Sequence, residues 1–138
     1  MRSLANLNKF KVMGMVTSAL YFYLFISLLL FPESILGDFG IIGNESVYVL
    51  ARRASMLMLG FCCLLFLSRN TPPSVVRQAI SFSIGLNMAG FALMSSFELV
   101  RGFAEMSVLC AIVIEVLVAT IYFSLLVFDR RYLNKSNG

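Results

Sequence analysis

Histidine is absent from this chain of 138 residues, and charged side chains make up only 13% of it. Without histidine, a histidine-ligated haem, a Ser-His or Cys-His nucleophile pair and the common zinc sites that contain histidine are excluded. No two of the three cysteines form a C-x-x-C redox pair. We therefore expect no enzyme, no metal site and no cofactor, and we interpret the cysteines as packing residues.

Hydrophobic side chains dominate instead, at 59% of the residues, with a mean hydropathy of +0.89. Soluble proteins have about 25% charged residues. Apolar stretches long enough to cross about 30 Å of hydrocarbon as helices cover about residues 12–31, 48–67, 76–97 and 106–128. The sequence predicts an all-α fold, a single membrane domain (1–138) formed by a bundle of four transmembrane helices. This leaves no room for a soluble catalytic domain.

The connections between the predicted spans differ in length. Pro72 and Pro73 make a short turn between the second and third spans, and Gly102 follows the end of the third. The only long connection is residues 32–47, which we expect to lie on the membrane surface as a turn of helix and a loop. Residues 1–11 and 129–138 are expected to form short tails.

The orientation in the membrane follows from the lysines and arginines, because these residues are more frequent on the cytoplasmic side. Eight of the eleven flank one side: Arg2, Lys9, Lys11, Arg69, Arg77, Arg130, Arg131 and Lys135. Arg52, Arg53 and Arg101 lie on the other side, with most of the acidic residues. Both termini are therefore predicted to be cytoplasmic. The net charge of +4 then reflects topology, and we expect no nucleic-acid partner.

The third span has a stripe of small residues that would let another helix approach closely. Its members recur at spacings of three and four: Ser81, Gly85, Ala89, Ala92 and Ser96. We expect this stripe to pack against a helix of the same bundle. A seam with a second copy or with another membrane protein is the alternative.

Glu115 is the sharpest candidate for a functional residue, because it lies about nine residues inside the fourth span. A carboxyl group at this depth cannot easily reach water and needs a partner, a proton or a cavity. Arg52 and Arg53 enter the second span from the same side. The sequence predicts that one of them pairs with Glu115.

Other charged residues are predicted to gather around this pair on the outer side. Glu98, Arg101 and Glu105 follow one another at helical spacings. The candidate ligand-binding or partner-binding residues are Arg52, Arg53, Asn87, Glu98, Arg101, Glu105 and Glu115. Three explanations of these residues stay open. They form a structural charge network, or they line a pocket for a small anionic or zwitterionic ligand or for a polar group of a partner, or they belong to a proton path through Glu115.

A run of arginine, small and apolar residues at 52–60, followed by 67–70 and by a third span that ends before Gly102, resembles the small DoxX-like proteins of bacteria. The resemblance covers residues 12–128 and implies a four-helix fold in the bacterial inner (plasma) membrane more than any activity. Other families with four spans depend on motifs that are missing here. Small multidrug exporters have a carboxylate in the first span, vitamin K epoxide reductase relatives have C-x-x-C, and sterol-isomerase relatives have histidine.

The function expected from the sequence is binding, as an accessory subunit of a membrane complex or as a small receptor with an outer-facing polar cluster. In the receptor version the arginines neutralise an acidic group of the ligand. In the subunit version the stripe of the third span is the seam. The alternative function is a protomer of an oligomeric proton-coupled transporter of small molecules, in which Glu115 is alternately protonated and paired.

Overall fold

The computed structural model describes residues 2–102, 106 and 108–136, and the regular elements there are helices. They are α1 (Arg2–Leu30), α2 (Pro32–Asp38), α3 (Glu45–Ser68), α4 (Val75–Val100) and α5 (Val108–Ser136). Of these, α1, α3, α4 and α5 each contain a segment long and apolar enough to cross a membrane. The predicted class, an all-α bundle with four candidate transmembrane helices, is confirmed.

The helix ends follow from local sequence signals. The side chain of Asn44 accepts a hydrogen bond from the backbone N–H of Val47 (3.1 Å) at the start of α3, and Ser74 accepts one from Arg77 (3.2 Å) at the start of α4. Pro32 occupies the first turn of α2, where its missing N–H costs nothing. Gly102 follows α4 with a φ of 76°, a conformation that glycine adopts without strain.

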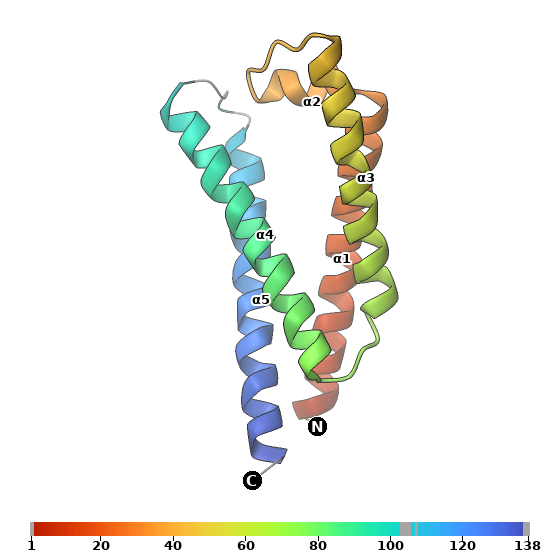
Figure 1. Cartoon of the computed structure of the whole chain (residues 1–138). Coiled ribbons are helices and arrows are strands. Elements are labelled where there is room, and N and C mark those ends of the chain that lie inside the picture. The colour runs from red at the N-terminus through yellow and green to blue at the C-terminus, as the bar shows by residue number, and fades with distance from the viewer. Residues whose placement is uncertain (1, 103–105, 107, 137–138) are drawn as a thin grey trace.

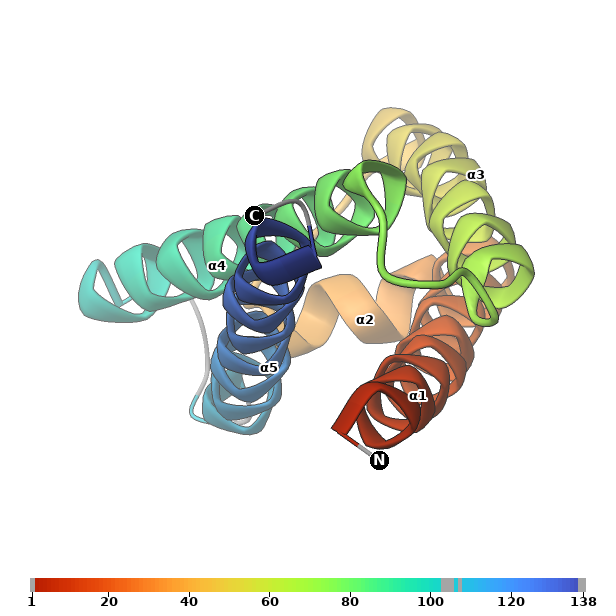
Figure 2. The ribbon, with the colours of Figure 1, turned by 90° about the horizontal axis from the view of Figure 1, so that it is seen from below.

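The four long helices form two pairs. α1 packs along α3, and α4 packs along α5, whereas α1 and α5 touch each other very little. Figure 1 shows that both termini lie at one end of the molecule, where α4 passes close to the α1–α3 pair. Toward the opposite end the two pairs move apart, and α2 lies across the space between them (Figures 1 and 2). We call these ends the termini end and the α2 end; the assignment of the termini end to the cytoplasm stays a prediction.

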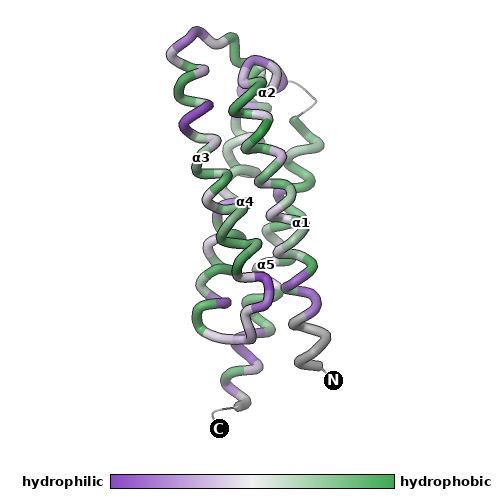
Figure 3. The backbone as a smooth tube through the Cα atoms, turned by 90° about the vertical axis from the view of Figure 1, so that its right-hand side faces the viewer, coloured by the Kyte–Doolittle hydropathy of each residue, from purple (hydrophilic) through white to green (hydrophobic). Residues whose placement is uncertain are grey.

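The core lies between the two pairs and runs along the bundle. Its largest fully buried members include Phe10 and Tyr21 of α1, Ile84 and Met88 of α4, and Tyr122 of α5. Large apolar side chains also cover much of the outer surface, and the tube in Figure 3 is hydrophobic along most of the long helices, with hydrophilic segments concentrated toward the two ends. A surface of this kind suits contact with lipid chains.

Two helices continue beyond the stretches that hydropathy marks. α1 begins at Arg2, well before residue 12, and α5 continues to Ser136, through most of the segment 129–138 that was expected to be a tail. Hydropathy reports how much of a helix suits the hydrocarbon and says nothing of where the helix ends. In the connection 32–47, α2 is a short helix followed by a loop that leads into α3.

Candidate functional site

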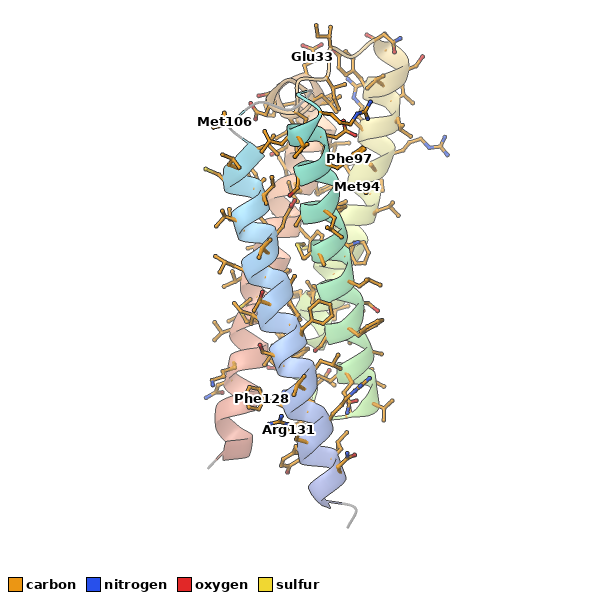
Figure 4. All side chains as sticks on the ribbon, turned by 90° about the vertical axis from the view of Figure 1, so that its left-hand side faces the viewer. Glu33, Met94, Phe97, Met106, Phe128 and Arg131 are labelled. Atoms are coloured by element: carbon orange, nitrogen blue, oxygen red, sulfur yellow. The ribbon has the colours of Figure 1, made fainter. Side chains whose placement is uncertain are left out.

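A chamber of about 230 Å³ lies where the two helix pairs move apart, beneath α2. All five helices contribute to it, and its walls are almost entirely apolar. The lining residues are Leu24, Leu28, Ile35, Leu36, Phe39, Met58, Phe91, Met94, Ser95 and Glu115. Figure 4 shows Met94 in the half of α4 that is nearer to α2. The divergence of the pairs therefore creates a hydrophobic chamber that α2 covers.

Glu115 is the one charged residue among those that line the chamber. Its Oε2 atom is shielded from solvent and has no hydrogen-bond partner among the described residues. Buried polar atoms are nearly always hydrogen-bonded, so a buried carboxyl oxygen without a partner calls for an explanation. A bound molecule that donates a hydrogen bond would provide one.

The prediction that Arg52 or Arg53 pairs with Glu115 is wrong. Arg52 and Arg53 are exposed on α3 and form no ion pair with Glu115. The reason is the pairing of the helices: α3 packs against α1, and α5 packs against α4. Arg52 instead lines a separate hollow of about 320 Å³ with Glu33 at the start of α2.

The remaining members of the predicted polar cluster lie in different environments. Arg101 Nη1 lies 3.3 Å from Oε1 of Glu98, about one helical turn earlier in α4, and the ion pair is exposed. Asn87 is inside the bundle, and Glu105 lies outside the described residues. The structure therefore leaves Glu115 in the chamber, Arg52 and Arg53 on the surface, and Glu98 with Arg101 near the end of α4.

Polar groups continue from the chamber into the core. The Tyr21 hydroxyl donates a hydrogen bond to Asn87 Oδ1 (3.0 Å), and the Tyr21 ring stacks on Phe61 of α3, with centroids 5.3 Å apart. Tyr21 thus links α1, α3 and α4.

Three buried hydroxyl groups extend this set toward the termini end. The Tyr122 hydroxyl faces Thr17 on α1, and Ser81 is buried on α4. None of the three oxygens has a hydrogen bond of normal geometry among the described residues. We call Tyr21, Asn87, Tyr122, Thr17 and Ser81 the polar column.

The termini end is closed by a buried ion pair. Arg77 of α4 donates from Nε to Asp129 Oδ2 (2.7 Å) and from Nη2 to Oδ1 (2.9 Å), and both side chains are almost fully buried. Arg77 also donates to the Thr71 carbonyl (3.3 Å), and its guanidinium lies 4.5 Å from the Phe10 ring centroid. One arginine therefore joins α4, α5, α1 and the turn before α4.

The charge pattern of the sequence did not predict this pair, because Arg77 reads as a flanking charge and Asp129 as the end of the fourth span. A signal was nevertheless present. In an antiparallel hairpin the start of one span lies beside the end of the next, so Arg77 and Asp129 fall at the same depth. Opposite charges at such positions are candidates for a bidentate pair.

The small-residue stripe of the third span, on α4, faces α5. A Cβ atom added at Gly85 would lie 3.2–3.4 Å from the Phe123 ring, which shows how closely the two helices approach there. Ala89, Ala92 and Ser96 line a hollow of about 390 Å³ together with residues of α5. In the structure the stripe therefore contacts a helix of its own bundle, and Ser81 is fully buried there.

No site for a metal ion is evident, because no three cysteine, aspartate or glutamate side chains come together in the part of the chain that the structure describes. Comparison of the chain with protein-family models, curated proteins and solved structures found no match. The resemblance to DoxX-like proteins therefore stays a prediction.

Proposed function

We propose that this protein acts by binding, as a small membrane receptor whose ligand occupies the chamber beneath α2. The observation that carries the proposal is the Oε2 atom of Glu115, which has no hydrogen-bond partner among the described residues and belongs to the one charged side chain of the lining. Ligand sites are typically apolar cavities with a few polar groups that fix orientation. An ionisable residue at membrane depth is a functional candidate by default.

The lining also indicates the chemistry of the ligand. No arginine or lysine lines the chamber, so the anionic or zwitterionic ligand expected from the sequence has no positive group to meet there. A carboxyl group accepts hydrogen bonds and attracts cations. The chamber therefore favours a compact lipophilic molecule with one ammonium or hydroxyl group.

The receptor version is favoured over the accessory subunit, because the stripe proposed as the partner seam faces α5, where Gly85 lies against the Phe123 ring. A partner could reach only the open hollow that Ala89, Ala92 and Ser96 line together with α5. The binding site beneath α2 needs no second chain, since residues of this one chain line it.

The test uses two probes of the same shape and opposite charge, adamantylamine and adamantane carboxylate, and the purified protein in lipid nanodiscs. Calorimetry should show the amine binding more tightly than the carboxylate. A charge-assisted hydrogen bond is worth about 1.5–3 kcal/mol, so Glu115→Gln should weaken amine binding about tenfold or more. Glu33→Gln, a change of an exposed acid outside the chamber lining, is the matched control and should have no effect. Preference for the carboxylate, or equal loss in both variants, would contradict the proposal.

A proton-coupled transporter is the second candidate, and the polar column is the observation that favours it. The buried hydroxyls of Tyr122, Thr17 and Ser81 place polar groups between Glu115 and the ion pair at the termini end. If they carry protons with trapped water, liposomes containing the protein should change their internal pH faster than protein-free liposomes when an adamantylamine gradient is imposed, and Tyr122→Phe should slow this. A receptor would bind the amine without moving protons.

A further inference from the structure

A second hollow lies at the other end of the molecule from the chamber, between α1 and α5. Its volume is about 510 Å³, and it is open to the surroundings of the bundle. It exists because α1 packs on α3 and α5 packs on α4, so that these two helices leave a groove where they pass each other. The apolar side chains along it are Val12, Met13, Ile121, Leu125 and Phe128. Figure 4 shows Phe128 in the lower part of α5, near the termini end.

One end of this groove is polar. Asn8 and Lys9 of α1 line it there, and the apolar stretch of α1 begins only three residues after Lys9, at Val12. The Lys9 side chain is exposed and has no acidic partner among the described residues. Its ammonium group therefore stands where hydrocarbon gives way to lipid headgroups, at the head of an apolar groove.

We propose that the α1–α5 groove binds one anionic phospholipid of the surrounding leaflet, with its phosphate at Lys9 and an acyl chain along the apolar side chains of α1 and α5. Charge complementarity favours this occupant. Arg130 and Arg131 lie at the same end of the molecule, and Arg131 lines another hollow that shares Phe128 with this groove. The site is independent of the chamber, which lies beneath α2 and carries a single acidic group.

A second copy of the chain fits this groove less well. Copies related by a rotation axis along the membrane normal keep each residue at its own depth. Lys9 of one copy would therefore meet the basic end of the other, and like charges would be brought together where a lipid phosphate would bring an opposite charge.

The experiment is native mass spectrometry of the full chain, released from nanodiscs that contain equal amounts of phosphatidylglycerol and phosphatidylcholine with identical acyl chains. The wild-type protein should retain one phosphatidylglycerol in preference to phosphatidylcholine. Lys9→Gln should lower that occupancy about fivefold, as expected for one basic residue near an anionic headgroup. Lys11→Gln is the matched control: it removes the same charge two residues away, from a side chain that does not line the groove, and should change the occupancy less than twofold.

A second variant tests the place of the acyl chain. Ser124→Trp puts a bulky ring into the groove and should remove the bound lipid, whereas Val113→Trp, on an exposed part of α5 outside the lining, should not. Equal retention of both lipids, equal effects of Lys9→Gln and Lys11→Gln, or a lipid-free protein would overturn the proposal. A dimer in place of bound lipid, lost in Ser124→Trp, would also overturn it and would assign the groove to a contact between copies.

Discussion

The two ends of the bundle hold a carboxyl group on the same face of α5 in opposite surroundings. Asp129, Tyr122 and Glu115 are spaced seven residues apart, almost two helical turns, so all three face the interior. At the termini end Asp129 meets Arg77 in two short hydrogen bonds. At the α2 end Glu115 meets a chamber. The depth of an acidic residue in the bundle is therefore not enough to make it a candidate for function. The groups that surround its carboxyl group also matter.

The difference follows from the geometry of the helix pairs. Where the pairs lie close together, an arginine from α4 reaches α5 and also covers the Phe10 ring of α1. Where they move apart, the nearest arginines on α3 are exposed, and α2 fills part of the space with apolar side chains. A buried pair that is fully hydrogen-bonded holds helices in register, and an unpaired acid keeps its capacity for a ligand.

The largest expected effect comes from breaking the paired end. Arg77→Ala leaves Asp129 as an uncompensated buried charge, so the free energy of unfolding should fall by about 3–5 kcal/mol. Unfolding by dodecyl sulfate in mixed micelles, followed by circular dichroism, measures this. Arg101→Ala, which breaks the exposed pair with Glu98, is the control and should cost less than about 1 kcal/mol. Equal losses would mean that the buried pair is no more important than the exposed one.

Replacing both partners of the buried pair sharpens the comparison. Arg77→Met combined with Asp129→Leu removes both charges and keeps apolar volume at the site, so most of the stability lost in Arg77→Ala should return. The same micelle titration measures the recovery. A double variant as unstable as Arg77→Ala would show that the hydrogen bonds to Thr71 and Asp129 stabilise the fold by themselves.

A smaller effect is expected in the polar column between the two ends. Tyr21→Phe removes the hydrogen bond to Asn87 and should lower the free energy of unfolding by about 0.6 kcal/mol, the average for such bonds in membranes. Tyr23→Phe, at an exposed position on the same helix, should leave it unchanged. A loss of several kcal/mol in Tyr21→Phe would contradict this prediction. It would show that the polar column stabilises the fold as strongly as the buried ion pair at the termini end does.

Much of the fold could be predicted from the sequence, because apolar stretches of bilayer length interrupted by Pro72–Pro73 and Gly102 leave few alternatives to four long helices. The small residues of the third span also indicated a close helix contact, which the structure has at Gly85. These features depend on neighbours in the sequence or on a single helix face, which residue spacing alone can indicate.

The site was harder to predict, because it depends on which helices are neighbours. Glu115 was identified from its depth, but its pairing with Arg52 or Arg53 assumed that α3 lies beside α5. The chamber has no sequence signal of its own, since its apolar lining comes from all five helices and resembles ordinary core or lipid-facing residues. The pair of Arg77 and Asp129 required the antiparallel register of α4 and α5.

The different roles of the two acids of α5 are tested most directly by comparing both under one set of conditions. The free energy of unfolding of Asp129→Asn and of Glu115→Gln is measured beside the wild type in the same micelles. We predict a loss of about 3–5 kcal/mol for Asp129→Asn, which removes the carboxylate partner of Arg77, and a change of less than about 1 kcal/mol for Glu115→Gln, which breaks no bond between described residues. A loss in Glu115→Gln as large as that in Asp129→Asn would contradict this prediction, because Glu115 would then be a structural partner and the chamber would have no free acid to offer a ligand.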